Sequence, residues 1–302
     1  MSSTPPQVKA PLTVADLKSS GGWRFFKSNL MMVLLGLAFV VVVVPVGFVL
    51  YSVIEKGIGI VVRDLPSWFT TDVPVRSRQP GPGMKSAIIG TVLITTAASV
   101  IAIPLGVLGA IYLNEYGRTS SFARVVRFLA NVMTGVPSIV MGLFIYIIVT
   151  VSTGLVGIAG SLALAALMLP IVIRSTEEML RLVPDHLREA SLALGSTKSR
   201  TILTVVLPSA APGVVSGCLL AVARAAGETA PLLFTIGAAT ATNWNLFHGE
   251  MTTLSRQIFA NALATTSGPV ERAWGAALTL MTLTFLFTVI ARVVTALSQK
   301  RR

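Results

Sequence analysis

The sequence predicts an all-α polytopic membrane protein with six transmembrane helices. Of its 302 residues, 53% are hydrophobic and only 12% are charged, and the mean hydropathy is +0.79, which exceeds the apolar content of ordinary soluble domains. Six apolar runs have the length of about 20 residues that crosses about 30 Å of hydrocarbon. They lack the alternation of a membrane β-barrel, so we expect helices.

The six predicted spans run from Leu30 to Val53, Ala87 to Tyr112, Phe128 to Val151, Leu155 to Ile173, Val214 to Ile236 and Ala273 to Ile290. We expect the first to remain as an anchor, because 29 mostly polar residues precede it and its 24 residues exceed the apolar core of a signal peptide. Several spans contain or adjoin proline, which favours bent helices.

Lysine and arginine predict the orientation. If the N-terminus is cytoplasmic, sixteen of the 24 basic residues fall in cytoplasmic segments and seven in external ones, so both termini are expected inside. The formal net charge of +12 is then a topology signal and an attraction to the lipid bilayer. Nucleic acid is not an expected partner, because no basic stripe carries interleaved stacking aromatics.

These assignments predict three parts. Residues 1–29 form a cytoplasmic N-terminal segment, residues 30–297 a six-span domain, and residues 298–302 a basic cytoplasmic tail. The lone cysteine, Cys218, rules out an intramolecular disulfide. His186 and His248 lie too far apart in sequence to suggest a metal site, so no metal or cofactor is expected in this chain.

A polar segment, residues 174–212, interrupts the apolar pattern. Ser175 and Glu178 have the spacing of a capping box, and Pro184 fits the first turn of a further helix that Gly195 would end. A second apolar helix would follow and end at Pro208. This predicts a compact cytoplasmic knob that either stabilises the loop or fits a groove on another protein.

The fifth span carries two charges, Arg224 and Glu228. An ionised group at the centre of a span costs about 2.5–3.5 kcal/mol, whereas an i,i+4 pair returns only about 0.2–0.5 kcal/mol. We therefore expect both to face protein or a watery path, where the guanidinium could hold an anion. Pro231 cannot donate to the carbonyl of Gly227, so the helix should bend or open there. The alternative is a structural ion pair beside a packing kink.

Weaker patterns concern the surfaces. Trp68 and Phe69 fit an interfacial anchor in the external loop 54–86, and Trp244 and Phe247 lie in the external loop 237–272, which could receive an external protein. Two pairs of small residues, at positions 106 and 110 and at 213 and 217, favour close helix contacts. A second subunit in the membrane is one expected occupant of those faces.

The knob carries a family pattern. Glu189-Ala190-Ser191, three residues, Gly195, nine residues and Val-x-Leu-Pro ending at Pro208 resemble the coupling loop of prokaryotic ABC-importer permeases. That loop reads Glu-Ala-Ala, three residues, Gly, nine residues, Ile-x-Leu-Pro. Only Ser191 and Val205 depart from it. The segments 224–234, 134–140 and 169–170 resemble PstA-type phosphate-uptake permeases, so the resemblance covers roughly residues 85–295.

The resemblance implies a type I ABC importer permease fold with cytoplasmic coupling helices, in a prokaryotic plasma membrane. It implies a transport subunit rather than an enzyme, with ATP and Mg²⁺ bound by a partner ATPase. Its expected partners are a second permease, two ATP-binding subunits and an extracytoplasmic phosphate-binding protein. Implied ATPase-coupling residues are Glu189, Ala190, Ser191, Gly195, Leu207 and Pro208; implied translocation residues are Arg224, Glu228, Gly227, Thr229 and Pro231.

Other functions also fit parts of this pattern. The order of residues 195–198 lacks the phosphate-binding Gly-x-x-x-x-Gly-Lys-Ser/Thr pattern, so this chain is not expected to hydrolyse ATP. A permease for another oxyanion, such as sulfate or molybdate, would use the same arginine chemistry. A secondary anion transporter or channel would also use charges inside the membrane, but needs no ATPase-docking loop. A sensor or structural subunit is the remaining class.

Overall fold

The structure is a computed structural model that describes residues 21–74 and 81–300. Within those residues it is helical, and five helices are long and apolar enough to cross a membrane, or six if one bent pair counts as a single span. The six-span, all-α prediction is therefore confirmed at the level of helices. The predicted N-terminal segment falls partly on residues 1–20 and the basic tail partly on residues 301–302, which lie outside the described residues.

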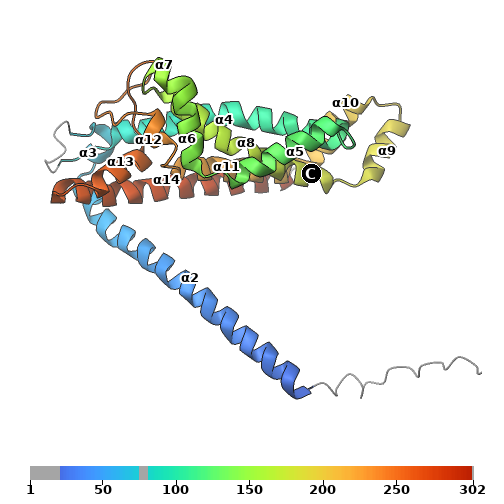
Figure 1. Ribbon diagram of the computed structural model, residues 1–302, viewed down its shortest axis with the longest axis horizontal. Helices are drawn as coiled ribbons and strands as arrows, with labels where there is room; N and C mark the ends of the chain where they lie inside the picture. The colour runs from blue at the N-terminus through green and yellow to red at the C-terminus, as the bar shows by residue number, and fades with distance from the viewer. Residues whose placement is uncertain (1–20, 75–80, 301–302) are drawn as a thin grey trace, which may run out of the picture. The chain divides into compact units, whose positions relative to one another are not determined.

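Helix labels follow Figure 1. The elements are α2 (Gly21–Arg63), α3 (Ser67–Thr70), α4 (Lys85–Ile111), η1 (Tyr112–Tyr116), α5 (Ser121–Gly135), α6 (Ser138–Ile145), η2 (Tyr146–Thr150), α7 (Val151–Thr153), α8 (Gly157–Arg181), α9 (Asp185–Ala193), α10 (Lys198–Thr201), η3 (Ile202–Val206), α11 (Leu207–Gly227), α12 (Leu232–Thr235), α13 (Leu254–Ala262) and α14 (Ser267–Lys300). The η elements are π-helical turns. The chain divides into two units at Ser52 and Val53.

The first unit contains most of α2. This helix includes the whole predicted first span and begins nine residues before it, at Gly21. Pro45 lies inside it without ending it, as is tolerated in membrane helices.

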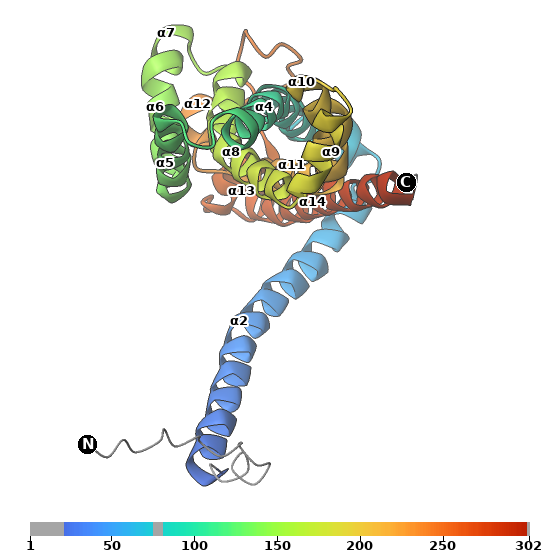
Figure 2. The same ribbon diagram turned by 90° about the vertical axis from the view of Figure 1, so that its right-hand side faces the viewer.

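In the second unit, α4 packs along α8, and α11 packs against α8 and α14. Figure 1 shows these helices along the length of the unit, with α9 and α10 at one end and α3 and α13 at the other. Figure 2 views them nearly end-on, with α5, α6 and α7 along one side. The core between them consists largely of Ala, Val, Leu and Ile, for example Ala98, Leu164, Val172 and Ala221.

The small residues serve this core. A Cβ at Gly106 would lie 2.6 Å from Cγ1 of Val172, and one at Gly217 would lie 2.5 Å from Oγ of Ser175. These glycines let α4 and α11 approach α8 of the same chain. The expectation that they contact a second permease is therefore wrong.

The end with α3 and α13 has its own core. Trp68 is fully buried, and its Nε1 donates to Oγ1 of Thr279 on α14 at 3.0 Å. Trp68 is thus a core residue rather than the interfacial anchor that the sequence suggested, whereas Phe69 is exposed. The predicted external loop 237–272 also folds inward through α13, where Leu254 is fully buried, whereas Trp244 and Phe247 are exposed.

The third predicted span is bent. Helix α5 ends at Gly135, α6 begins at Ser138, and the two parts meet at 108°. Pro137 cannot continue the hydrogen-bonding pattern, and it also keeps Val136 out of the helical region, with ψ of 128°.

Candidate functional site

The knob, residues 182–206, lies at the end of the second unit opposite α3 and α13 (Figure 1). Its first helix, α9, starts after Pro184 and stops at Ala193 as predicted. Gly195 has φ of +83°. The Gly195 N–H donates to the carbonyl of Leu192 at 2.9 Å, and the Ser196 N–H to that of Ser191 at 3.2 Å. This is a Schellman stop, which confirms the predicted role of Gly195 in ending the helix.

The capping box is wrong. Helix α8 continues through Ser175 and Glu178 to Arg181, and the Ser175 hydroxyl donates to the carbonyl of Val172 within the same helix. The span simply extends eight residues beyond its predicted end at Ile173. A run of good helix formers, including Glu177 and Glu178, continues the helix into the polar segment.

The predicted stop at Pro208 is also wrong. Helix α10, the π turn η3 and α11 form one helical stretch from Lys198 to Gly227. Pro208 lies in the first turn of α11, and the pattern widens to π-helix over Ile202–Val206 just before it. The π turn sits where proline withholds an N–H from the helix, so the chain continues instead of ending.

The implied coupling residues divide by exposure. Glu189, Ala190 and Gly195 are exposed on the knob, whereas Ser191 is half-buried. The Ser191 Oγ lies 2.9 Å from Oγ1 of Thr201. This contact links α9 to α10, the two arms of the knob. Leu207 and Pro208 are half-buried at the base of α11. The implied coupling residues from Glu189 to Gly195 therefore lie on the knob itself, whereas Leu207 and Pro208 lie where the knob joins α11.

A surface groove of about 780 Å³ opens between the arms. Its lining includes Leu187, Leu194 and Val205 beside Ala190, with Ser196 and Arg200 at the polar part. A groove lined by both apolar and polar side chains, on a knob that also exposes Glu189, is the kind of surface that docks a short segment or edge of another protein.

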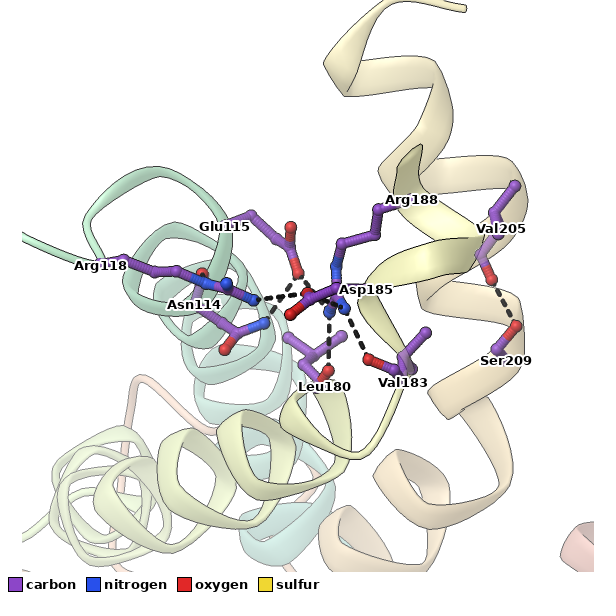
Figure 3. Close-up of polar contacts among 9 residues, drawn as sticks. All are labelled: Asn114, Glu115, Arg118, Leu180, Val183, Asp185, Arg188, Val205 and Ser209. Atoms are coloured by element: carbon purple, nitrogen blue, oxygen red, sulfur yellow. Dashed lines mark hydrogen bonds and ion pairs between the residues drawn. The ribbon is translucent and has the colours of Figure 1, made fainter. Parts of the chain in front are cut away.

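A buried ionic junction joins the knob to the helices (Figure 3). Arg188 on α9 donates through Nη2 to Oε1 of Glu115 at 3.0 Å and to the carbonyl of Leu180 at 2.9 Å. Through Nη1 it donates to the carbonyl of Val183 at 2.6 Å and to Oδ1 of Asp185 at 3.0 Å. The side chains of Arg188 and Glu115 are only 11% and 5% exposed.

Neighbouring contacts extend this junction. Asn114 donates to Oε1 of Glu115 at 2.7 Å, and Nε of Arg118 donates to the backbone carbonyl of Asn114 at 2.9 Å. The Tyr116 hydroxyl lies 3.4 Å from Oγ of Ser199, and the Lys198 ammonium lies 4.8 Å from the centre of the Tyr116 ring. Glu115 therefore contacts α9, and Tyr116 contacts α10.

The sequence did not identify this junction. The signal that was present is small: Glu115 is the only acidic residue between Leu113 and Arg127, on the side predicted to hold the knob. Arg188 and Glu115 are 73 residues apart, so periodicity along the chain could not pair them.

The second candidate site is the break after α11. The helix ends at Gly227, and Glu228 is extended with φ of −69° and ψ of 135°. The helical chain resumes at Leu232, with Pro231 as its N-cap. The predicted opening before Pro231 is confirmed, but Arg224 and Glu228 do not lie on one continuous helix face. They still pair, with Nε and Oε1 3.6 Å apart.

This break exposes one charge more than the other. The Arg224 side chain is 68% exposed and that of Glu228 is 21% exposed. The carbonyl of Thr229 accepts from the N–H of Leu232 at 3.1 Å and so starts the next turn. Arg224 therefore presents its guanidinium outward from the chain, beside a carboxylate that is held at the break.

Other helices hold the break in place. Ser255 Oγ, on α13, donates to the carbonyl of Glu228 at 2.9 Å. The N–H of the preceding residue, Leu254, donates to Oγ1 of Thr91 near the start of α4 at 2.9 Å. The break thus lies toward the α3 and α13 end of α4, not at its midpoint.

Two interrupted helices meet here. Helix α12, which follows the break, packs against α6, the second half of the bent span. Gly142 on α6 lies directly against the backbone of Pro231, so closely that a Cβ at position 142 would overlap it. Discontinuous helices that pack together are a common way to expose polar backbone inside a membrane.

Comparisons with known proteins agree with this architecture. Residues 102–302 match the family described as binding-protein-dependent transport system inner membrane component. The chain is 40% identical over 301 residues to the phosphate transport system permease protein PstA 1 of Mycobacterium tuberculosis, covering 98% of this chain and 95% of that one. It is 41% identical over 228 residues to PstA of Haemophilus influenzae, covering 74% and 78%.

A solved structure shares the fold. The MetNI methionine ABC transporter, in inward-facing conformations, aligns with a TM-score of 0.56 at 20% identity, over 70% of this chain and 93% of that chain. This confirms the expected ABC importer permease fold. The chain belongs to the binding-protein-dependent transport system inner membrane components and, among them, to the PstA-type permease family.

Proposed function

We propose that this chain is a transmembrane permease subunit of an ATP-driven importer that carries inorganic phosphate into the cytoplasm. The observation that carries the proposal is the 40% identity, over almost the whole chain, to proteins named phosphate transport system permease. The exposed groove of the knob and the interrupted helix after Gly227 support the proposal as candidates for the two parts that such a subunit needs. One would meet an ATPase, and the other would lie along the path of the ion.

The proposed assembly has this chain paired with a second permease, two ATP-binding subunits and an external phosphate-binding protein, in a prokaryotic plasma membrane with both termini inside. Sixteen basic residues against seven support that orientation. ATP and Mg²⁺ would be held by the ATPase subunits, with Glu189, Ala190 and Gly195 at the docking surface.

For the ion path we propose Arg224 as the anion-binding group. Its planar guanidinium suits two phosphate oxygens at once, and its exposure leaves it available to an ion or to the partner permease. Glu228 would orient Arg224 or repel the anion once it has passed. Gly227, Thr229 and Pro231 would supply the open backbone around them.

A deletion strain tests the substrate. Cells that lack this gene are grown at limiting phosphate, and initial uptake of labelled phosphate and labelled sulfate is measured side by side. The proposal expects loss of phosphate uptake alone, restored by the intact gene. Loss of sulfate uptake alone would assign the permease to another oxyanion.

Arg224 is tested in the same cells. Arg224→Gln should abolish most phosphate uptake at normal membrane levels of the protein, and Arg224→Lys should retain part of it, because lysine keeps the charge but not the two-pronged geometry. Arg292→Gln, an exposed arginine on α14, is the matched control. Wild-type uptake by Arg224→Gln would leave only a structural role for the Arg224–Glu228 pair.

A further inference from the structure

The π turn η1, at the end of α4, is joined to the knob by its most buried ionic contact. The N–H of Gly117 donates to the carbonyl of Tyr112, five residues back, at 2.7 Å, which is the hydrogen bond of a π-helix. Such turns are rare in proteins, and those that occur often lie at functional sites. This one places Glu115 against α9 and Tyr116 against α10, so adjacent residues contact both arms of the knob.

Arg188 reaches from the knob to the ends of two helices. Its two terminal nitrogens donate four hydrogen bonds, while its Nε is buried without a hydrogen-bond partner among the described residues. Two go to the carbonyls of Leu180 and Val183, at the C-terminal end of α8, where helix carbonyls lack partners and a cation is favoured. One guanidinium therefore binds the end of α8 and the end of α4 together.

Because this ion pair is buried, separating its two side chains would be costly. With side chains only 11% and 5% exposed, the two groups are largely shielded from water, and separating them would leave a buried charge without compensation. The exposed contacts of the knob differ: Arg118 and Asp185 are 3.4 Å apart, with side chains 53% and 65% exposed, and such pairs contribute little.

We propose that the Glu115–Arg188 pair makes α9, the end of α8 and the end of α4 move as one body, so that displacement of the knob by a docked ATPase reaches the transmembrane helices. Arg188 and Glu115 are positioning residues in this proposal, and it rests on the proposed function. Without the pair, the knob would still dock, but its movement would be taken up at the loop between Arg181 and Asp185.

The test uses the complete transporter, reconstituted in proteoliposomes with its ATPase subunits and binding protein. Two rates are measured, ATP hydrolysis and accumulation of labelled phosphate, and their ratio is compared among variants. Glu115→Gln keeps the shape and one acceptor oxygen but removes the charge, and Arg188→Lys keeps the charge but not the fork. Asp185→Asn, which alters an exposed partner of the same guanidinium, is the matched control.

We expect Glu115→Gln and Arg188→Lys to hydrolyse ATP at near the wild-type rate while the phosphate moved per ATP falls about ten-fold, the scale of losing one charge-assisted hydrogen bond. Asp185→Asn should keep the wild-type ratio. An unchanged ratio in Glu115→Gln would overturn the proposal. So would parallel loss of hydrolysis, transport and assembly, which indicates a role in folding only. If instead wild-type transporter moves no phosphate, the proposed substrate fails, and the ratio is measured with sulfate.

Discussion

The hydroxyl of Ser255 donates a 2.9 Å hydrogen bond to the backbone carbonyl of Glu228. This contact ties α13, which the sequence assigned to an external loop, to the residue that directly follows the end of α11. Ser255 is buried, so the carbonyl of Glu228 has a fixed partner in place of the helical N–H that the chain no longer supplies. The break is therefore held by tertiary structure as well as by Pro231.

Ser255→Ala should loosen the break. Losing one buried hydrogen bond costs about 1 kcal/mol, which is small for the stability of the whole domain. Because the bond is at the proposed ion path, we expect phosphate uptake to fall several-fold with little change in the melting temperature. Ser216→Ala, an exposed serine on α11, is the control, and equal uptake by both variants would remove Ser255 from the account.

Gly142→Ala tests the contact between the two interrupted helices. A methyl group at position 142 overlaps the backbone of Pro231, and overpacking of this kind costs about 1–3 kcal/mol. We expect reduced uptake and a lower melting temperature in detergent. At Gly135, by contrast, a Cβ meets nothing within 4 Å, so Gly135→Ala should behave as wild type. Wild-type behaviour of Gly142→Ala would mean that α6 and α12 are not closely packed.

Gly195 tests the end of α9. With φ of +83°, an alanine there costs about 1–2 kcal/mol of backbone strain, although a Cβ meets nothing within 4 Å. If the strain falls on the docking conformation, ATPase-subunit affinity should drop about 5- to 30-fold. Asparagine tolerates this conformation, so Gly195→Asn should bind more tightly than Gly195→Ala. The reverse order, measured by co-purification or titration, would contradict the Schellman stop as the reason for glycine.

Glu177 tests the attachment of α5. Its Oε1 accepts from Nε of Arg127 and from Nη2 of Arg181, both at 2.7 Å, and its side chain is only 10% exposed. Glu177→Gln removes the charge between two arginines, so we expect a loss of about 2 kcal/mol of stability. The neighbouring, exposed Glu178 offers the control variant Glu178→Gln. Equal melting temperatures for the two variants would show that the network contributes nothing.

Apolar length was enough to predict the number of spans, with the bent pair counted as one, because burial in lipid imposes it on every spanning helix. It did not give the bounds of the fifth span, which was expected from Val214 to Ile236, whereas the helix runs from Lys198 to Gly227. Proline and glycine also predicted local features correctly: Pro231 the open helix, and Gly195 the end of α9. The same reasoning failed for Ser175 and Pro208. At each of these positions, a helix that had begun earlier in the chain continues past the residue that was expected to start or end a helix. Local stop and start patterns compete with a helix already under way, and the sequence does not show which prevails.

Contacts between distant segments could not be predicted. Three contacts join residues that lie far apart in the chain and meet only where the helices pack: Glu115 with Arg188, Trp68 with Thr279, and Ser255 with Glu228. From its position in the sequence, we could predict only on which side of the membrane each of these residues lies, and not which residue it contacts. The coupling and translocation residues remain proposals, and their arrangement in the structure shows where to test them.

The most direct test of the central claim is ATP-driven phosphate accumulation in proteoliposomes that contain this chain, the second permease, the ATPase subunits and the binding protein. With no other importer present, we predict accumulation of labelled phosphate that needs ATP, is lost when Arg224 is changed to glutamine, and is unaffected by excess sulfate. Accumulation of sulfate instead, or phosphate movement that continues without ATP, would contradict the account.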